Sequence, residues 1–436
     1  MTLNAGQKLW EQAKKLIPGG NMLLSKRPEM FLPDYWPAYY SKCKDCYVWD
    51  LEDKKYIDVS IMGIGTNILG YANPEVDMAV QSVVTSGNMS TLNCPEEVRL
   101  AERLVGMHPW ADMVRLARSG GEANAISIRI ARAACGKDNV AICGYHGWHD
   151  WYLATNLADA EGLDGHLLPG LNPSGVPQKL RGSIFPFKYN EFETLKRLVS
   201  DHDIGVIKME VMRSAPPKPG FLEQVRSLCD EKNIILIFDE CTSGFRQAFG
   251  GIHKIFGVEP DIATFGKALG NGYAISAVVG KRSVMDSAQS TFISSTFWTE
   301  RIGPAAALKT LEVMERDKSW EVITSIGNKI RNRWLEIGKR TNLPIEVSGL
   351  PAILSYSFDL PKSQIIRTAV TQLMLKNGFL STPLVYVSTA HTEQVLDLYF
   401  ENLELVFGTI KEAINQDNLE NILDGPVCHS GFSRLN

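Results

Sequence analysis

Short, continuous apolar runs alternate with helical patterns through the middle of the chain. The clearest runs cover residues 140–143, 205–209, 234–238 and 275–279. Apolar runs that lie between amphipathic helices are typical of strands buried on both faces of a mostly parallel sheet, because helices cover both sides of such a sheet. The pattern therefore predicts a large α/β domain.

The N-terminal part shows a different pattern. Apolar positions at helical spacing over residues 9–17 follow Asn4, a residue type that favours the N-cap of a helix, and predict a first amphipathic helix. Residues 21–40 contain three prolines and predict a surface crossing, and residues 47–50 and 55–58 read as two short strands joined by a turn. This part has little core of its own.

The C-terminal part mixes helices and strands. A long helical pattern covers residues 302–340, short strands are predicted over 345–347 and 353–358, and a last helix over 393–413. These elements indicate a smaller α+β domain, which we expect the N-terminal segment to complete. The expected parts are an N-terminal segment of the small domain (1–61), the large domain (62–318) and the C-terminal small domain (319–436).

The composition favours small-molecule chemistry. The chain has 436 residues, with 45 Lys and Arg against 49 Asp and Glu and a net charge of −4. This length exceeds the ~250–300 residues that one hydrophobic core normally supports. Nucleic-acid and anionic-membrane surfaces need a strong basic excess, so the charge balance argues against both.

Segment types that are missing from the sequence indicate the cellular compartment. The N-terminal segment lacks a continuous apolar stretch, and the chain has no run of about 18 apolar residues, so we expect a cytoplasmic protein. The eight cysteines are scattered, which favours reduced thiols over a disulfide framework. Cys43 and Cys46 form a C-x-x-C pair, but no second pair at zinc-ribbon spacing follows, so we expect no metal site.

Two charged residues follow predicted strands at the positions where α/β enzymes bind ligands. Asp239 comes directly after the run 234–238, and Lys267 lies in the glycine-containing segment 265–272. Singly, Asp239 reads as a helix cap and Lys267 as a solvated charge. Together they describe a pyridoxal phosphate site, in which the lysine forms a Schiff base and the buried acid keeps the pyridine nitrogen protonated.

A glycine turn opens the helical run 123–129 and is the candidate phosphate site. Ser119, Gly120 and Gly121 form this turn, and the free backbone N–H groups and positive dipole end of the helix favour a bound anion. The alternative is a plain Gly-Gly turn with a serine cap. The segment 145–149, Tyr-His-Gly-Trp-His, offers an aromatic face for a pyridine ring, although a core aromatic cluster has the same composition.

Six motifs in a fixed order connect these candidate sites. They are Leu69-Gly70-Tyr71 with Pro74 and Val76, and the segments 119–123, 145–147, 238–246, 266–272 and 295–297. With these motifs the chain resembles the class III pyridoxal-phosphate-dependent aminotransferases of fold type I, and within them the glutamate-1-semialdehyde aminomutase-like branch. The resemblance covers nearly the whole chain and implies an α/β large domain with a mostly parallel central sheet plus a smaller α+β domain.

The resemblance also implies a role for individual residues. Lys267 is the Schiff-base lysine, which later moves a proton between substrate and cofactor, and Asp239 is the partner of the pyridinium nitrogen. The other implied cofactor contacts are Ser119, Gly120 and Gly121 at the phosphate, Tyr145 on the ring face, His146, and Thr296 of the partner subunit. A homodimer with shared active sites is therefore expected, acting on a small-molecule amino donor and a carbonyl acceptor.

Two departures from the family pattern concern the cofactor and the substrate. Gly121 stands where the family usually has a hydroxyl residue, which removes a phosphate hydrogen bond worth ~1–2 kcal/mol unless another group replaces it. Residues 381–391 resemble the corresponding segment of the aminomutase, but they are shorter and lack its acidic residue. The first change affects the expected cofactor affinity, and the second indicates a rebuilt substrate pocket.

A third departure introduces a cation. Residues 210–213, Glu-Val-Met-Arg, stand where the family commonly has Glu-Pro followed by small residues. Arg213 is the candidate anchor for an anionic group of the substrate, with Arg27 and Ser25 in the surface crossing as the alternative. An ordinary ion pair of Arg213 with a surface acid explains this residue equally well.

These observations favour an aminotransferase that moves an amino group between an amino donor and a carbonyl acceptor through Lys267. The alternative is glutamate-1-semialdehyde 2,1-aminomutase, which transfers the amino group within one molecule and gives 5-aminolevulinate. A cofactor-holding protein without turnover is a weaker hypothesis, because Lys267 and Asp239 are both present. A nicotinamide dehydrogenase is weaker still, because no G-x-G-x-x-G follows an early strand.

Overall fold

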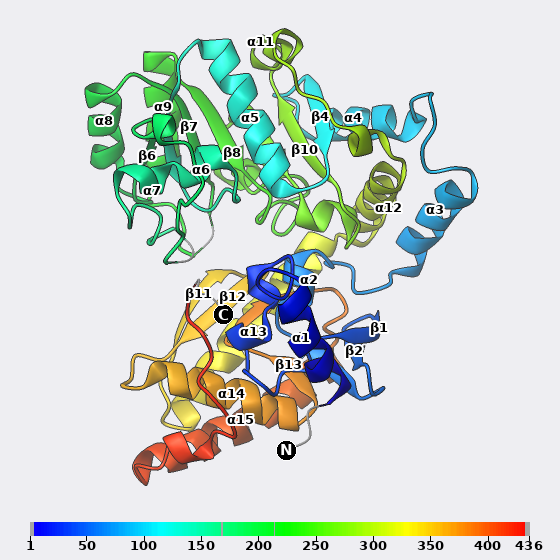
Figure 1. The fold of residues 1–436 in the computed structure, drawn as a ribbon, viewed down its shortest axis with the longest axis vertical. Coiled ribbons are helices and arrows are strands. Elements are labelled where there is room, and N and C mark those ends of the chain that lie inside the picture. The colour runs from blue at the N-terminus through cyan, green and yellow to red at the C-terminus, as the bar shows by residue number, and fades with distance from the viewer. Residues whose placement is uncertain (1–3, 167–168, 213, 432–436) are drawn as a thin grey trace. The chain divides into compact units, whose positions relative to one another are not determined.

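The computed structural model describes residues 4–166, 169–212 and 214–431 (Figure 1). The chain forms two compact units. The first combines Met1–Asn73 with Val322–Asn436, and the second is Pro74–Glu321. The second unit thus begins at Pro74, later than the boundary predicted at residue 62.

A seven-stranded sheet forms the centre of the second unit, in the order β4-β10-β9-β8-β7-β5-β6. Strands β5 to β9 of this sheet run parallel to one another, whereas β10 is antiparallel to both β4 and β9, so the sheet is mixed. The strands are β4 (Met113–Ala117), β5 (Asn139–Cys143), β6 (Ile184–Pro186), β7 (Ile204–Glu210), β8 (Ile235–Asp239), β9 (Ile262–Phe265) and β10 (Ser276–Gly280). The apolar runs of the sequence therefore become buried central strands, as predicted.

Helix α5 (Gly120–Cys135) covers one face of this sheet. Its Ile126 and Ile130 pack in the same buried cluster as Val206 and Ile237 of the central strands. The other helices of the unit are α3 (Pro74–Thr85), α4 (Pro95–Met107), α6 (Asp150–Leu153), α7 (Thr155–Ala158), α8 (Phe192–Asp201), α9 (Phe221–Lys232), α10 (His253–Phe256), α11 (Arg282–Met285) and α12 (Ile302–Asp317). The unit is thus a sheet core with helical cover, which is the architecture that the pattern predicts.

The long helical pattern over 302–340 is two helices. Lys318 adopts a left-handed conformation with φ of 47° and ends α12. Helix α13 (Ser319–Arg340) then begins. A single residue with positive φ cannot continue a right-handed helix, so the predicted uninterrupted segment is wrong at this point.

The first unit joins the two ends of the chain. Its N-terminal helix α1 (Ala5–Leu16) begins at the predicted cap, where Asn4 and Gln7 form a capping box. One sheet has the order β1-β2-β3-β13, and β3 pairs in parallel with β13. The strands of this sheet are β1 (Tyr40–Lys44), β2 (Tyr47–Asp50), β3 (Lys55–Val59) and β13 (Phe379–Ser381). The predicted small domain built from both termini is therefore confirmed, with β1 as a strand that the pattern did not predict.

A second small sheet completes the first unit. It has the order β11-β12-β14 and is entirely antiparallel. Its strands are β11 (Glu346–Leu350), β12 (Ile353–Ser357) and β14 (Leu384–Tyr386), and the remaining helices of the unit are α2 (Met62–Gly65), α14 (Ser363–Lys376) and α15 (Glu393–Asn415). The core contains the fully buried Trp334 and Tyr399, and the indole of Trp334 donates to the Tyr399 hydroxyl at 3.0 Å.

Within the described ranges, no helix combines the length and the apolar character needed to cross a bilayer.

Candidate active site

The carboxyl ends of the parallel strands of the second unit meet at one edge of the sheet. Glu210 ends β7 and pairs in register with Asp239 at the end of β8, and Asp239 pairs with Thr264 of β9. Tyr145 follows β5 and Lys267 follows β9. Because ligands of open α/β sheets bind beyond these strand ends, this edge is the candidate active site.

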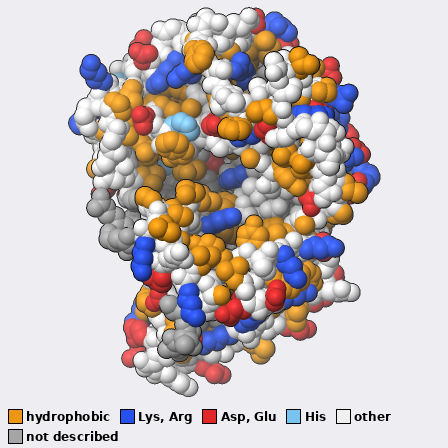
Figure 2. All heavy atoms as spheres, turned by 45° about the vertical axis from the view of Figure 1, so that its right-hand side comes forward, with side chains coloured by type: hydrophobic (Ala, Val, Ile, Leu, Met, Phe, Trp, Pro, Cys, Tyr) orange, Lys and Arg blue, Asp and Glu red, His pale blue; other side chains and the backbone are white. Residues whose placement is uncertain are grey.

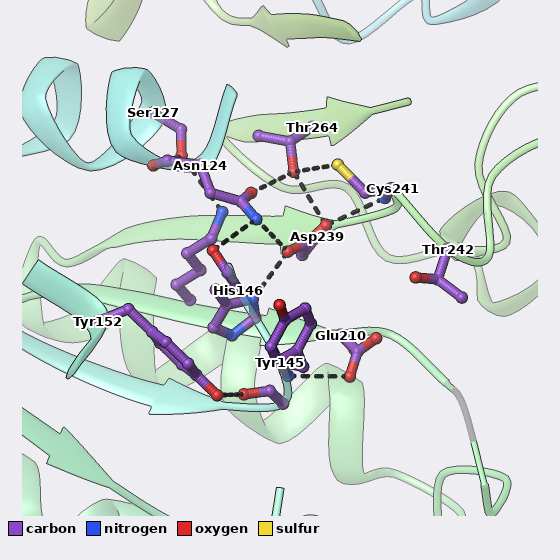
Figure 3. A network of polar contacts seen from close by, with 12 residues as sticks. Asn124, Ser127, Tyr145, His146, Tyr152, Glu210, Asp239, Cys241, Thr242 and Thr264 are labelled. Carbon is purple, nitrogen blue, oxygen red and sulfur yellow. Dashed lines mark hydrogen bonds and ion pairs between the residues drawn. The ribbon is translucent and has the colours of Figure 1, made fainter. Parts of the chain in front are cut away.

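Asp239 lies at the centre of a network of polar contacts (Figure 3). Its Oδ2 accepts a hydrogen bond from Asn124 Nδ2 at 2.8 Å and another from His146 Nδ1 at 2.8 Å. Its Oδ1 accepts from the backbone N–H of Cys241 at 3.0 Å and from the Thr264 hydroxyl at 3.2 Å. The carboxylate is only 3% exposed, so these donors replace the water that burial removes.

The surroundings keep Asp239 ionised. Burial alone would raise its pKa, but the hydrogen bond from His146 and the positive charge of Lys208 outweigh burial and hold the pKa of Asp239 well below its ordinary value. A carboxylate that stays charged in a low-dielectric site can hold a proton on a neighbouring pyridine nitrogen. The site therefore has the electrostatics that the sequence predicts for Asp239.

Lys208 is a participant that sequence reasoning missed. It lies on β7 with no exposed surface, and its Nζ donates to the Ser127 hydroxyl of α5 at 3.2 Å. Burial lowers the pKa of Lys208, whereas the charge of Asp239 raises it. A lysine inside the apolar run 205–209 was the available signal, because a charge buried in a sheet needs a compensating partner.

Lys267 begins the short 3₁₀ turn Lys267–Gly270 after β9. Its backbone is left-handed, with φ of 42°, a conformation that costs a non-glycine residue ~1–3 kcal/mol and that clusters at functional sites. Its Nζ donates to the Thr242 hydroxyl at 2.7 Å. The turn thus places the amine next to the loop that follows Asp239. Thr242 in this loop is, after Lys208, a second residue whose role the sequence did not indicate.

The glycine turn caps helix α5 as predicted. Ser119 is the N-cap, its hydroxyl accepts from the N–H of Glu122 at 3.3 Å, and its own N–H donates to the Glu122 carboxylate at 2.8 Å. The N–H groups of Gly120 and Gly121 stand at the start of the helix, where no carbonyl four residues earlier belongs to the helix. These two groups and the helix dipole form a cradle that suits a phosphate.

Tyr145 and His146 take different positions. The N–H of Tyr145 donates to Glu210 Oε2 at 3.2 Å, and its ring meets the Tyr152 ring edge to face at 5.9 Å. His146 has no exposed surface and contacts Asp239 through Nδ1. Tyr145 is therefore suited to a ring contact, whereas His146 is placed to act through Asp239.

The remaining predicted residues lie elsewhere. Thr296 is exposed and begins the 3₁₀ turn Thr296–Thr299 of the second unit. That turn is tied to α5 by a hydrogen bond of 3.2 Å from the Trp298 indole to Glu122. Arg213 lies outside the described residues. Arg27 and Ser25 belong to the first unit, and their substrate role stays a prediction.

These residues fit pyridoxal phosphate in their chemistry. A buried anionic carboxylate suits a protonated pyridine nitrogen, a lysine amine suits the aldehyde carbon, and the N-terminus of α5 suits the phosphate. All three groups belong to the second unit. Asp239 ends β8, Lys267 follows β9, and the turn at Gly120 begins α5, the helix that covers the same sheet.

Comparison with known proteins agrees with this chemistry. Residues 33–390 match the family described as aminotransferase class-III. The chain is 33% identical over 429 residues to 3-aminobutyryl-CoA aminotransferase of Cloacimonas acidaminovorans (strain Evry), covering 95% of this chain and 99% of that protein. It is 30% identical over 427 residues to glutamate-1-semialdehyde 2,1-aminomutase of Methanothrix thermoacetophila, covering 93% and 97%. The protein therefore belongs to the class III aminotransferases.

Solved structures give the same result for the fold. The FumI protein of Sphingopyxis sp. MTA144, in its PLP internal aldimine form, superposes with a TM-score of 0.86 at 26% identity and covers 96% of this chain and 100% of its own. An omega-transaminase from Sphaerobacter thermophilus superposes with a TM-score of 0.82 at 22% identity over 93% and 97% of the two chains. The fold is that of PLP-dependent transaminases, and the predicted family, fold class, cofactor and enzyme class are confirmed.

Proposed function

We propose that this enzyme is an aminotransferase that releases one carbonyl product and then needs a separate acceptor, with Lys267 as the lysine that carries the cofactor. The observation that carries this proposal is the position of Lys267 in a left-handed turn just after β9, next to strand β8, which ends at the buried and ionised Asp239. When bound, pyridoxal phosphate supplies an electron sink for the negative charge that develops on the substrate carbon bearing the amino group.

Lys267 and Thr242 handle the proton. With the cofactor bound, the Nζ of Lys267 would take the proton from the amino-bearing carbon of the substrate and deliver it to the cofactor carbon that carried the aldehyde. The Thr242 hydroxyl, 2.7 Å from this Nζ, orients the amine. Asp239 keeps a proton on the pyridine nitrogen, and His146 and Asn124 hold the carboxylate in place through their bonds of 2.8 Å.

Three further groups bind and orient the cofactor in this proposal. The N–H groups of the turn formed by Ser119, Gly120 and Gly121 hold the phosphate, supported by their place at the start of α5. Tyr145 covers a face of the ring, supported by its place two residues after the end of β5. Arg213, Arg27 and Ser25 are proposed substrate contacts.

Release of a carbonyl product is favoured over an intramolecular transfer. An aminomutase must retain its intermediate by holding a short acidic substrate at both ends. The segment 381–391 is shortened and lacks the acidic residue of the aminomutase pattern. The aminotransferase of Cloacimonas acidaminovorans also shares 33% identity over nearly the full chain. The alternative, glutamate-1-semialdehyde 2,1-aminomutase, is supported by the 30% identity to enzymes of that name.

A donor screen without acceptor tests the proposal. Protein loaded with pyridoxal phosphate is mixed with candidate donors, among them 3-aminobutyryl-CoA, the donor named in the Cloacimonas relative. A true donor should give one equivalent of free carbonyl product per site and then stop until an oxo acid is added. Conversion of glutamate-1-semialdehyde to 5-aminolevulinate at roughly 1 s⁻¹ or faster without any acceptor identifies the aminomutase instead.

We further propose a cytoplasmic homodimer in which Thr296 of the partner subunit reaches the phosphate. Large apolar side chains are exposed on the second unit, including Leu92 (81%), Phe292 (84%) and Phe297 (69%), and apolar groups are visible among the charged ones in Figure 2. A subunit interface would remove these aromatic and aliphatic side chains from water, which supports the dimer. Light scattering should give about twice the chain mass of 48.4 kDa. A monomer that binds the cofactor normally contradicts this arrangement.

A further inference from the structure

The space beside Gly121 is filled by a neighbouring histidine. A Cβ atom at position 121 would lie 2.9 Å from Cε1 and 3.1 Å from Nδ1 of His149, and 3.6 Å from the Trp148 ring. Contacts below about 3 Å are closer than van der Waals packing allows. The imidazole of His149 therefore stands where a side chain at position 121 would have to enter.

The backbone of the loop after β5 brings His149 to this place. Gly147 has a φ of 107°, and a Cβ atom on it would lie 3.0 Å from the Cα of Gly121. The two glycines thus allow the loop to approach the start of α5 backbone to backbone. His149 is the residue directly before α6, and its ring stacks on Trp148 with centroids 4.5 Å apart. These contacts fix the imidazole next to the turn.

The Nδ1 atom of His149 is buried and has no hydrogen-bond partner among the described residues. Burial lowers the pKa of this imidazole, whereas the carboxylates of Glu122 and Asp150 raise it. Buried polar nitrogens in folded proteins nearly always have a partner, so a partner from a ligand is the simplest account of this atom. The atom lies 3.1 Å from the Cβ position of Gly121, which is the second residue of α5.

We propose that His149 replaces the hydroxyl side chain missing at position 121 and donates a hydrogen bond from Nδ1 to the phosphate of pyridoxal phosphate. This inference rests on the proposed role of the turn Ser119–Gly121 as the phosphate site. It is consistent with the glycine at position 121, because a side chain there would displace the imidazole of His149 from its present position.

Cofactor affinity with and without the phosphate tests the proposal. Apo-enzyme is titrated with pyridoxal phosphate and, separately, with pyridoxal, and the dissociation constants are compared between the wild type and His149→Ala. A charge-assisted hydrogen bond corresponds to roughly a tenfold to hundredfold change in affinity. We expect His149→Ala to weaken pyridoxal phosphate by this factor and to leave pyridoxal unchanged.

A matched control separates a phosphate contact from a general effect of losing a histidine. His202 lies on the same unit, is exposed, and stacks on Phe185 with centroids 4.0 Å apart. His202→Ala should leave both dissociation constants unchanged. An equal loss for pyridoxal phosphate and pyridoxal in His149→Ala, or no loss for either, overturns the proposal.

An exchange of the two side chains provides a second measurement. Gly121→Ser alone should weaken cofactor binding, because its Cβ meets the imidazole at 2.9 Å. Gly121→Ser combined with His149→Ala should recover affinity to within about threefold of the wild type, since the hydroxyl returns and the ring is gone. If the losses of cofactor affinity in the two single variants simply add in the double variant, the hydroxyl does not replace the imidazole, which contradicts the proposal.

The same titration distinguishes failure of this inference from failure of the proposed phosphate site. A wild-type protein that binds pyridoxal as tightly as pyridoxal phosphate shows that the turn does not hold the phosphate, which overturns both. A wild type that prefers pyridoxal phosphate together with an unaffected His149→Ala overturns only the role of His149. Thermal unfolding of each variant verifies that it is folded under the conditions of the titration.

Discussion

The two ends of the candidate active site are built in opposite ways. At Asp239, both carboxylate oxygens accept hydrogen bonds from residues of the chain itself, and the group is almost fully buried. At Gly121 there is no side chain, the Ser119 hydroxyl is used in the helix cap, and Nδ1 of His149 has no partner among the described residues. The hydrogen bonds of Asp239 are all made within the protein, whereas the Gly121 end offers hydrogen-bond donors to a ligand.

The difference follows from the cost of burial. A carboxylate removed from water must be bonded in every state of the protein, or the fold loses several kcal/mol. A missing partner costs less at the start of α5. The N–H groups there and the half-buried His149 are neutral donors, so they need a hydrogen-bond partner less than a buried carboxylate does. We therefore expect the Asp239 end to determine the rate of the reaction and the Gly121 end to determine how tightly the cofactor binds.

Removal of Lys267 should have the largest effect. Lys267→Ala removes the amine that moves the proton, and we expect turnover to fall by at least about 10³-fold. Both ends of the site remain, so the variant protein should still retain pyridoxal phosphate non-covalently. Borohydride reduction of the wild type followed by peptide mapping checks the assignment, and a label on another lysine would contradict it.

Asp239→Asn should have the next largest effect. It tests directly whether the Asp239 end determines the rate and the Gly121 end the cofactor affinity. The amide keeps the volume but cannot hold the pyridine nitrogen protonated. We expect a rate loss of about 10²-fold, which corresponds to about 2.7 kcal/mol of transition-state stabilisation, with little change in cofactor affinity. If the variant binds the cofactor much more weakly but turns over at a normal rate, then Asp239 determines affinity and not rate, which contradicts the comparison.

A pH effect of intermediate size is expected from the loop that carries Tyr145. His166 accepts a hydrogen bond from the N–H of Gly144 at 2.9 Å, and burial lowers the pKa of His166 to about 4. The ordinary pKa is about 6.5, so this stability contribution is full above that pH and is lost as the pH falls through the folded pKa.

The measurement is the free energy of unfolding between pH 7 and about pH 4. We expect it to fall by about 1–2 kcal/mol from this group, discounted for its partial exposure. His166→Gln keeps an acceptor for Gly144 and does not titrate, so it should remove this part of the slope. An unchanged slope in that variant assigns the pH dependence to other groups.

Lys208→Met should have the smallest effect. It measures whether the other groups around Asp239 can keep the carboxylate ionised without Lys208. His146 and the backbone of Cys241 still hold the carboxylate ionised, so we expect a rate loss of only about threefold. Replacing a buried charge by an apolar side chain of similar length should leave the unfolding free energy unchanged or raise it by about 1 kcal/mol. Ser127→Ala, which removes only the hydroxyl that Lys208 bonds, is the control. A rate loss as large as that of Asp239→Asn would show that Lys208 carries the ionisation alone.

The sequence alone determined the elements and the strand-end residues. Strand β8 and the position of Asp239 at its end follow from a local apolar run, and the start of α5 follows from a serine cap with glutamate three residues later. Such features depend on neighbours within a few residues, and the rule that ligands bind at carboxyl strand ends then places Asp239 and Lys267 together. The candidate chemistry could be predicted for this reason.

Only the tertiary structure decided which groups complete each end. The partners of Asp239 come from α5, the loop after β5 and β9, and the approach of His149 to Gly121 depends on two glycines far apart in the sequence. In the sequence, Lys208 only interrupts an apolar strand. The register pairs it with Ile237, two residues before Asp239, and its charge lowers the pKa of that carboxyl. Contacts of this kind depend on backbone approach and strand register, which no local pattern encodes, so the sequence indicates the chemistry while the packing selects the residues that tune it.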